Sequence, residues 1–325
     1  MSTVAVDVTQ VVELACRAPS VHNTQPWRWR FDGRAVELRA DHARQLRVSD
    51  PAGRNLVISC GAALHHALVA AAGLGFTASV ARLPDPGDPD LLARVELRPD
   101  RRPTPADTSL LEALRDRRTD RRRFTSWPVP EEQLVTLAEH ASRRGARVLP
   151  LTGVTARRTV ERLIDRAVAA QVAEPALAEE QRAWTTASPT GGIPASSLPP
   201  QDHPEERRDR FERRTPRAMA DARVVASDQV LAFCTARDDT AARLDVGETL
   251  SSVWLRAQQI GLSLVPLSQV IEVEPTRRAL RHDVFLDMAE PQLLARVGWL
   301  ELHRHPLPAT PRRPLTDVLD LAPGS

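Results

Sequence analysis

The chain has 325 residues, 42% of them hydrophobic and 26% charged, which are ordinary values for one large globular domain or two smaller ones. Its 44 basic and 42 acidic side chains leave a net charge of +2, so no overall field favours nucleic acid or a membrane surface as a partner. No apolar run has the length of a membrane span and the N-terminus carries no secretory pattern, so we expect a cytoplasmic protein.

The residue types that are missing exclude several kinds of chemistry. The sequence contains neither Lys nor Tyr, which excludes Schiff-base catalysis, a P-loop lysine and a tyrosine general acid. Cys16, Cys60 and Cys234 lie far apart and are interpreted as core thiols rather than as a disulfide framework. No motif supports a Ser-His-Asp or Cys-His set or a metal site, so we expect no catalytic side chain of that kind and no metal.

The first part of the chain has the pattern of a helix, a hairpin and a second helix. Residues 8–15 form an amphipathic run that predicts a short helix, with Asp7 as its N-cap and Pro19 beyond its end. The dipeptide Asp32-Gly33 predicts a hairpin turn. Apolar runs predict strands at 27–31, 35–39, 76–83 and 91–98, and a helix at about 53–74. This helix is apolar nearly all round, which is typical of a buried helix.

The second part repeats this alternation after a polar link at 100–107. Its patterns predict helices at 108–116, 131–144, 156–173 and 247–260, and strands at 147–151, 229–235, 263–270 and 292–302. Residues 185–216 are rich first in Pro and then in charge, so they cannot bury enough apolar surface to fold alone. An insertion of this kind is either a functional lid or disordered, and we favour a lid.

An internal repeat indicates two similar halves. Gly61 lies in the first buried helix and Gly75 ends it, 14 residues later; Gly247 and Gly261 have the same spacing at the second buried helix. Each glycine of the second pair stands 186 residues after its counterpart in the first. We predict an α+β fold whose halves, 1–107 and 108–325, correspond to a homodimer fused into one chain, and we expect a monomer.

The segment 18–27, Ala-Pro-Ser-Val-His-Asn-Thr-Gln-Pro-Trp, concentrates small hydrogen-bonding groups between a helix and a strand. Such a loop suits a polar, planar ligand, but a surface turn held by its own side chains has the same composition. The segment resembles the A-P-S-x-x-N-x-Q-P-W motif of nitroreductase-like flavoproteins, where it contacts flavin mononucleotide (FMN). The resemblance implies FMN contacts from Pro19, Ser20, Val21, His22, Asn23 and Gln25.

The arginine-rich segment 117–124 allows three interpretations: a nucleic-acid site, a solvated helix end, or a phosphate clamp. Near-zero net charge and the lack of interleaved aromatic residues disfavour nucleic acid. Arg forks and a hydroxyl are good phosphate ligands, so we favour the clamp. The segment is similar to the family's R-x-[ST]-x-[RK] element for the flavin phosphate, on Arg117, Arg118, Thr119 and Arg121.

Two further segments resemble flavin-binding elements of the same family. Pro266, Leu267 and Ser268 occupy the positions whose backbone approaches the flavin ring, although Ser268 stands where the family often has Glu and Gln269 where it often has Gly. Arg312 and Arg313 resemble a late basic pair that returns to the phosphate, and a flexible tail over 305–325 is the alternative.

The four matches occur in the order found in the Acg-type, actinobacterial subfamily of nitroreductase-like proteins. The resemblance implies two halves, each with a buried central helix and a mixed or antiparallel sheet, and one FMN between them. It implies NAD(P)H-dependent reduction of nitro or quinone acceptors through flavin N5. A protein that stores or sequesters FMN beneath its lid is the alternative, and a regulatory protein that retains only the fold is a third class. The expected partners are therefore small-molecule electron donors and acceptors.

Overall fold

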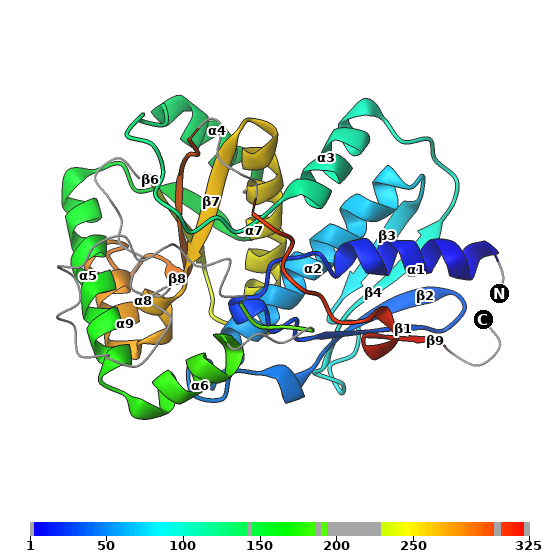
Figure 1. Cartoon of the computed structure of the whole chain (residues 1–325), viewed down its shortest axis with the longest axis horizontal. Coiled ribbons are helices and arrows are strands. Elements are labelled where there is room, and N and C mark those ends of the chain that lie inside the picture. The colour runs from blue at the N-terminus through cyan, green and yellow to red at the C-terminus, as the bar shows by residue number, and fades with distance from the viewer. Residues whose placement is uncertain (1–2, 142–144, 186–189, 194–228, 302–306, 322–325) are drawn as a thin grey trace.

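The computed structural model describes residues 3–141, 145–185, 190–193, 229–301 and 307–321. Two halves lie side by side, and one long helix from each packs against the other between them (Figure 1). These helices are α2 (Arg54–Gly73) and α7 (Thr240–Gln259), and their packing is the most extensive helix–helix contact among the described elements.

The first half is built on a sheet with strand order β3-β4-β2-β1-β9. Its strands are β1 (Trp27–Phe31), β2 (Ala35–Ala40), β3 (Thr77–Arg82), β4 (Leu91–Arg98) and β9 (Leu319–Leu321). The predicted hairpin is confirmed, because β1 and β2 pair antiparallel. Trp27, Trp29 and Phe31 face the core while the alternating arginines face outward, so one face of β1 is buried.

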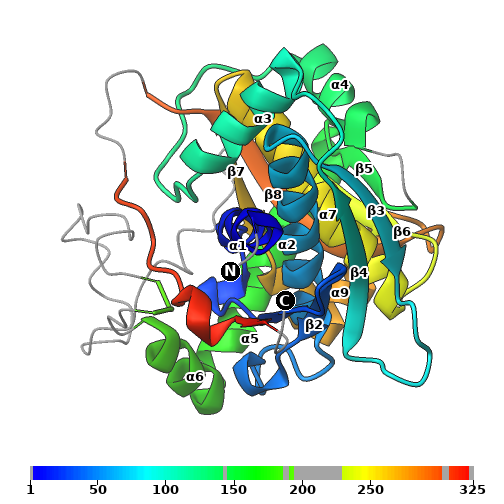
Figure 2. The same ribbon diagram turned by 90° about the vertical axis from the view of Figure 1, so that its right-hand side faces the viewer.

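Helix α2 packs on this sheet, and two other helices pack on α2 (Figure 2). They are α1 (Thr3–Ala15) and α3 (Pro105–Asp116). Thr104 and Asp107 form a capping box at the start of α3, so the helix begins just before the boundary that we predicted at 107/108. The prediction of Asp7 as an N-cap is wrong, because α1 begins four residues earlier and Asp7 lies inside it.

The second half is built on a sheet with strand order β5-β6-β8-β7. Its strands are β5 (Arg147–Pro150), β6 (Gln229–Thr235), β7 (Leu262–Leu267) and β8 (Glu290–Trp299). Residues 230–235 of β6 are buried without interruption, because helices cover both faces of this sheet. The helices of this half, besides α7, are α4 (Glu131–Ala141), α5 (Val154–Val172), α6 (Pro175–Thr185), α8 (Gln269–Glu272) and α9 (Glu274–Asp283).

Several predicted bounds are wrong in the second half. Helix α7 begins at Thr240 rather than at Gly247, because Asp239 caps it through a bond from the backbone N–H of Ala242. Strand β7 ends at Leu267, and the expected continuation to Val270 is instead the short helix α8. Helices α6, α8 and α9 and strand β9 were not predicted. Most of the predicted lid, 186–189 and 194–216, lies outside the described residues, as do parts of the 305–325 tail.

The two sheets share one topology, which confirms the predicted α+β fold with two similar halves. The order β3-β4-β2-β1 corresponds to β7-β8-β6-β5, and every pair within each series is antiparallel. Helices α2 and α7 are both 20 residues long, and their bounds differ by the same 186 residues at each end. By length and composition α2 could cross a membrane, but 78% of its most apolar window is buried inside the protein.

The C-terminal segment leaves the second half and joins the first. Strand β9 pairs parallel with β1, and the segment before it runs along the first half (Figure 1). Residues 319–321 therefore belong to the first sheet, and Pro311 and Arg313 before them are bonded to the loop 18–27.

Candidate functional site

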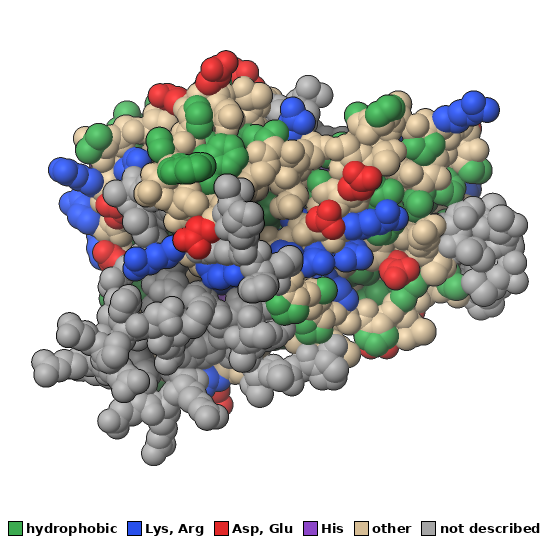
Figure 3. Space-filling model, turned by 45° about the horizontal axis from the view of Figure 1, so that its top comes forward, with side chains coloured by type: hydrophobic (Ala, Val, Ile, Leu, Met, Phe, Trp, Pro, Cys, Tyr) green, Lys and Arg blue, Asp and Glu red, His purple; other side chains and the backbone are tan. Residues whose placement is uncertain are grey.

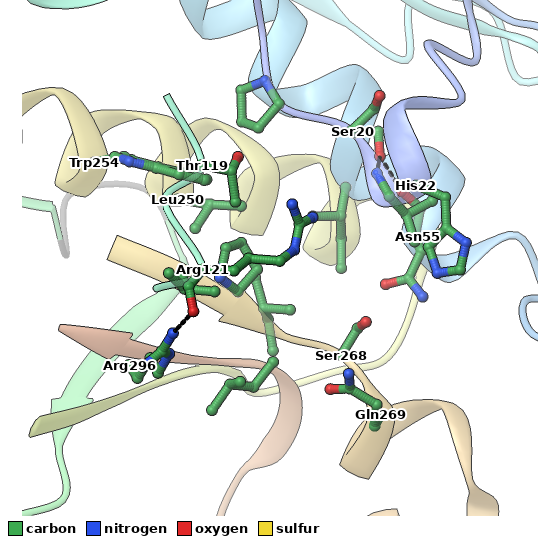
Figure 4. Close-up of a pocket in the computed structure, with 18 of the residues that line it drawn as sticks. Ser20, His22, Asn55, Thr119, Arg121, Leu250, Trp254, Ser268, Gln269 and Arg296 are labelled. Carbon is green, nitrogen blue, oxygen red and sulfur yellow. Dashed lines mark hydrogen bonds between the residues drawn. The ribbon is translucent and has the colours of Figure 1, made fainter. Parts of the chain in front are cut away.

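A cavity between the two halves brings together segments far apart in the sequence. It comprises about 920 Å³ of space that protein atoms do not fill, its open mouth included. The predicted site residues that line it are Pro19, Ser20, Val21, His22, Thr119, Arg121, Pro266, Leu267 and Ser268. Figure 4 shows that they come from the 18–27 loop, the 117–124 segment and the end of β7.

The 18–27 loop is held in a tight and unusual conformation. His22, Asn23 and Gln25 all have positive φ, between 46° and 54°, a region that side chains other than Gly rarely adopt. The Ser20 hydroxyl accepts a hydrogen bond from the backbone N–H of Gln25 at 3.0 Å. The backbone N–H of Val21 donates to the Ser59 hydroxyl of α2 at 3.2 Å. Strain of this kind persists only where the surroundings fix it, as is common at ligand sites.

Two predicted residues of this loop do not appear among the residues lining the cavity. The Asn23 amide donates to the carbonyls of Gly192 and Pro311, each at 3.0 Å. The Gln25 amide donates to the Thr190 carbonyl at 3.0 Å. Their side chains therefore fasten the loop to the described piece of the predicted lid and to the C-terminal segment.

Arg121 carries a positive charge into the cavity. Its guanidinium group extends toward the loop that carries Ser20 and His22 (Figure 4). Burial, and then the charge of Arg296, lower the Arg121 pKa to about 10, so the group remains charged at neutral pH. Burial, and then the charge of Arg121, lower the His22 pKa to about 4, so His22 is neutral. Its buried Nδ1 atom has no hydrogen-bond partner among the described residues.

The other arginines of the 117–124 segment have different positions. Arg122 forms a bidentate ion pair with Asp120, with bonds of 2.8 and 2.5 Å. Arg117 and Arg118 instead line a neighbouring groove, which we call the arginine groove. Its basic residues are Arg17, Arg115, Arg117, Arg118, Arg312 and Arg313. Basic side chains gather across the middle of the face drawn in Figure 3.

Arg117 of the arginine groove contacts a residue that lines the cavity. It lies over the ring of Trp254, 4.6 Å from the centroid, and Trp254 also lines the cavity. Burial, and then the charges of Arg312, Arg118 and Arg17, lower the Arg117 pKa well below its ordinary value. Its Nε and one terminal nitrogen have no hydrogen-bond partner among the described residues, and neither does the Nε of Arg118. A buried group of like charges with unused donors suits an anion such as phosphate.

Arg312 and Arg313, the predicted basic pair near the C-terminus, make different contacts. Arg312 donates to the backbone carbonyls of Cys16 and Arg17, at 2.9 and 3.1 Å, within the arginine groove. Arg313 forms a buried ion pair with Asp41 at 3.2 Å and donates to the Trp27 carbonyl. Arg313 thus fixes the C-terminal segment to β1, whereas Arg312 adds charge beside Arg117. Both residues are ordered by these contacts, which disagrees with the alternative of a flexible tail.

The walls of the cavity combine apolar side chains with polar and charged ones in nearly equal number. Pro266 and Leu267 come from β7, and Ser268 follows them. The buried Oε1 atom of Gln269 has no hydrogen-bond partner among the described residues. Sequence analysis did not assign several other lining residues, namely Asn55, Ile58, Ser59, Ile193, Leu250, Trp254, Val265, Gln269, Leu293 and Arg296. Such walls suit a ring system that carries both apolar surface and hydrogen-bonding groups.

The internal repeat could have predicted some of the lining residues that sequence analysis missed. Ile58 of α2 and Leu250 of α7 belong to the two matched buried helices, and helices that cross between the halves must line any cavity formed there. Arg296 carried no such signal, because it lies in a buried strand; its guanidinium donates to the Arg121 carbonyl at 2.6 Å. In the described ranges, no group of three or more His, Cys, Asp or Glu side chains has a metal-binding arrangement.

No protein-family model matches the chain. Two proteins of Mycobacterium tuberculosis (strain ATCC 25618 / H37Rv) that are named "Putative NAD(P)H nitroreductase" match it nearly end to end. Rv3131 is 40% identical over 317 residues, which is 96% of this chain and 91% of the relative. The protein named acg is 35% identical over 324 residues, 96% and 94% of the two chains.

Among solved structures, the FMN and NADPH-dependent nitroreductase NfnB from Sphigopyxis sp. strain HMH matches 65% of this chain and 97% of its own, with 18% identity and a TM-score of 0.44. The two mycobacterial relatives extend over almost all of both chains at identities well above chance similarity. The chain therefore belongs to the nitroreductase-like family, in its Acg-type branch.

Proposed function

We propose that this protein binds one FMN and uses NAD(P)H to reduce nitro- or quinone-type acceptors. The observation that carries the proposal is that the cavity and the arginine groove adjoin: Arg117 of the groove lies over Trp254 of the cavity wall. An aromatic ring system with a phosphate on a flexible tail has the chemistry that suits the cavity and the adjoining arginine groove. The names of the relatives and of the solved nitroreductase support FMN and NAD(P)H as the reactants.

The residues fit FMN by their chemistry. Arg117, Arg118 and Arg312 would bind the phosphate, because their charges repel one another and unused donors remain on two of them. The backbone after Pro266, together with Ser20 of the facing loop, would contact the ring. FMN supplies the redox chemistry, because its ring accepts a hydride equivalent from a nicotinamide and passes the electrons on.

The protein's own part is binding, electrostatics and exclusion of water. The Arg121 guanidinium is buried and stays charged, so it would favour negative charge on a ring bound in the cavity. Trp254 and Leu250 are buried side chains of the cavity wall and would keep water away from a ring bound against them. The neutral His22 can donate or accept one hydrogen bond without adding charge.

A second candidate function is storage or sequestration of FMN without turnover. Ile193 lines the cavity, and the backbone next to it is bonded to Asn23 and Gln25. Helix α6, just before this segment, is fastened to the first half by Glu180, which accepts bonds from Val48, Ser49 and the Ser49 hydroxyl at 2.8–2.9 Å. A lid anchored near its start by these contacts would keep a nicotinamide away from the ring.

Anaerobic titration of the purified protein with NADPH and with NADH tests both candidates. Rapid loss of the flavin's long-wavelength absorbance supports an oxidoreductase, and the assay then extends to nitroaromatic and quinone acceptors. Absorbance that persists with NAD(P)H but disappears with dithionite supports storage. A colourless protein that added FMN does not bind contradicts both.

A further inference from the structure

Two buried carboxamide side chains line neighbouring parts of the cavity wall. Asn55 is the second residue of α2 and Gln269 is the first residue of α8, and both line the cavity (Figure 4). The two residues are only 5% and 6% exposed. Glu272, the last residue of α8, is hydrogen-bonded to Asn55 and lies one turn after Gln269, so the two amides come from adjoining elements. We call Asn55 and Gln269 the amide pair.

Glu272 fixes which end of the Asn55 amide is available to a ligand. One oxygen of the Glu272 carboxyl accepts a bond from Asn55 Nδ2 at 3.1 Å, and the other accepts one from the Gln171 amide of α5 at 2.7 Å. An amide nitrogen can only donate, so the carboxyl is the acceptor in both bonds. Among the described residues, no donor is bonded to Asn55 Oδ1. Asn55 therefore offers the cavity an acceptor oxygen.

Gln269 has a second acceptor oxygen that the described residues do not satisfy. Its Oε1 atom is buried without a hydrogen-bond partner among them. A buried amide without a partner costs free energy that an apolar side chain of similar size would not, so its presence points to a ligand. Gln269 also stands where the nitroreductase-like pattern often has Gly, which has no side chain. The amide is therefore a feature of this chain and not of that pattern.

Two acceptor oxygens in one place select a ligand group that carries an N–H. The oxidised flavin ring has a single N–H, on the imide nitrogen between its two carbonyl groups. Walls as buried as the amide pair suit a resident cofactor better than a donor or acceptor that must exchange in every turnover. Trp254, beside the arginine groove, and Asn55 lie on opposite sides of the cavity (Figure 4), so opposite walls would serve the phosphate and the imide of one flavin.

We propose that the amide pair recognises the flavin ring by accepting its imide N–H, and that Glu272 is the positioning residue that holds Asn55. The inference rests on the proposed binding of FMN and adds the side chains that select the ring. Asn55 and Gln269 contact the ring, whereas Glu272 acts only through the Asn55 amide. No covalent bond forms or breaks in this recognition, so it contributes affinity and specificity.

Comparison of FMN with 3-methyl-FMN, in which a methyl group replaces the imide hydrogen, tests the proposal. Fluorescence titration of the apoprotein gives the dissociation constant of each flavin. We expect the wild-type protein to bind FMN at least about tenfold more tightly, because the methylated ring leaves both oxygens without a donor. Gln269→Met should lower this ratio, and Asn55→Leu combined with it should bring the ratio below about threefold. Steric bulk of the methyl group alone would leave the ratio the same in every variant.

Two further variants test the positioning role and supply a control. Glu272→Gln should also lower the ratio, because a glutamine side chain has one acceptor oxygen and cannot hold the Asn55 and Gln171 amides together. Gln258→Met is the matched control for Gln269→Met. Gln258 is a partly exposed residue of α7 that does not line the cavity, so this variant should keep the wild-type ratio.

A second readout needs no flavin. The Gln269→Met apoprotein should melt at a higher temperature than the wild type, because the substitution removes a buried amide that has no partner. A lower melting temperature would mean that Gln269 supports the fold, which contradicts its role in the amide pair. A protein that binds neither flavin contradicts the proposed function itself. A protein that binds FMN but shows one ratio in wild type and Gln269→Met overturns the amide pair alone, and this variant decides even where Asn55→Leu fails to fold.

Discussion

Gly61 and Gly247 lie against each other where α2 crosses α7. A Cβ atom added to Gly61 would lie 3.0 Å from the Cα of Gly247 and 2.2 Å from the Leu244 carbonyl oxygen. A Cβ added to Gly247 would lie 2.8 Å from the Cα of Gly61 and 2.0 Å from the Ile58 carbonyl oxygen. Because Ile58 and Leu244 are also 186 residues apart, each helix meets the other through equivalent positions. The crossing is thus a local two-fold axis within one chain.

Alanine at either crossing position should separate the helices. We expect Gly61→Ala and Gly247→Ala each to lower the free energy of unfolding by about 1–3 kcal/mol or more, because the added methyl group meets backbone that cannot move aside. Urea denaturation measures the loss. Gly153→Ala is the control, because nothing lies within 4 Å of its added Cβ. Equal stability of all three variants would contradict the close crossing.

The glycine spacing in the sequence predicted that Gly61 and Gly247 occupy equivalent positions in the two halves. Gly61 and Gly247 were matched by offset alone, and the structure places them in contact. The contact itself could not be predicted, because an offset identifies equivalent positions but does not say which of them meet. The early start of α7 was missed for a different reason: the turn before Gly247 contains charged residues and lacks the apolar pattern, and Asp239 was not considered as a cap.

Retention of FMN should depend on arginines from the cavity and from the arginine groove. We expect Arg118→Ala combined with Arg121→Ala to weaken FMN binding, because each charge-assisted contact contributes about 1.5–3 kcal/mol. Fluorescence titration of the apoprotein with FMN measures the dissociation constant. Arg256→Ala, an exposed arginine on α7, is the control and should bind as the wild type does. Unchanged FMN affinity in the double variant would contradict the roles proposed for both Arg118 and Arg121.

The protein should be a monomer that binds a single FMN. At the position equivalent to Ser59, which anchors the 18–27 loop, the second half has Asp245. Near it, buried Glu248 forms a bidentate ion pair with Arg82 at 2.6 and 2.8 Å. Charged side chains therefore fill the region related by the repeat to the cavity. Light scattering and the ratio of flavin to protein test this; a stable dimer or two FMN per chain would contradict it.

Part of the site could not be predicted because it depends on contacts distant in sequence. The motif at 18–27 marked Asn23 and Gln25 as ligand contacts, yet in this fold their amides bind the 190–192 backbone. The sequence gives no means of distinguishing an amide that faces a ligand from one that fastens a neighbouring segment. Strand β9 was missed because three residues within a Pro- and Arg-rich tail carry too short a pattern.

Glu180 should control how tightly α6 is held to the first half. Its carboxylate accepts bonds from two backbone N–H groups and one hydroxyl, at Val48 and Ser49. We expect Glu180→Gln to weaken this contact by about 1–3 kcal/mol, because a neutral amide accepts fewer and weaker bonds. Hydrogen exchange at these two amides should become faster, and bound FMN should dissociate sooner. Glu179→Gln, at the neighbouring exposed residue, is the control. Faster hydrogen exchange at Val48 and Ser49 in both variants would contradict a specific role of Glu180.

Asp238 should make the stability of the protein sensitive to acid. Its carboxylate pairs with Arg54 of α2, with Arg243 of α7 at 3.1 Å and with Arg277 of α9 at 3.4 Å. Burial raises the Asp238 pKa, but the bonds and charges of Arg54 and Arg243 outweigh burial and lower the pKa well below the ordinary value of 3.8. Because the folded state holds this group ionised, the stabilisation is present above pH 3.8 and is lost as the pH falls below it.

Asp238→Asn should therefore destabilise the protein at neutral pH and have little further effect in acid. We expect a loss of about 1–3 kcal/mol near pH 7, because three arginines lose a shared, partly exposed partner. Thermal unfolding of the variant and the wild type across the acidic range should give curves that converge below pH 3.8. Asp320→Asn, at an exposed position of β9, should follow the wild type throughout. Curves that stay parallel at every pH would mean that Asp238 acts through packing and not through its charge.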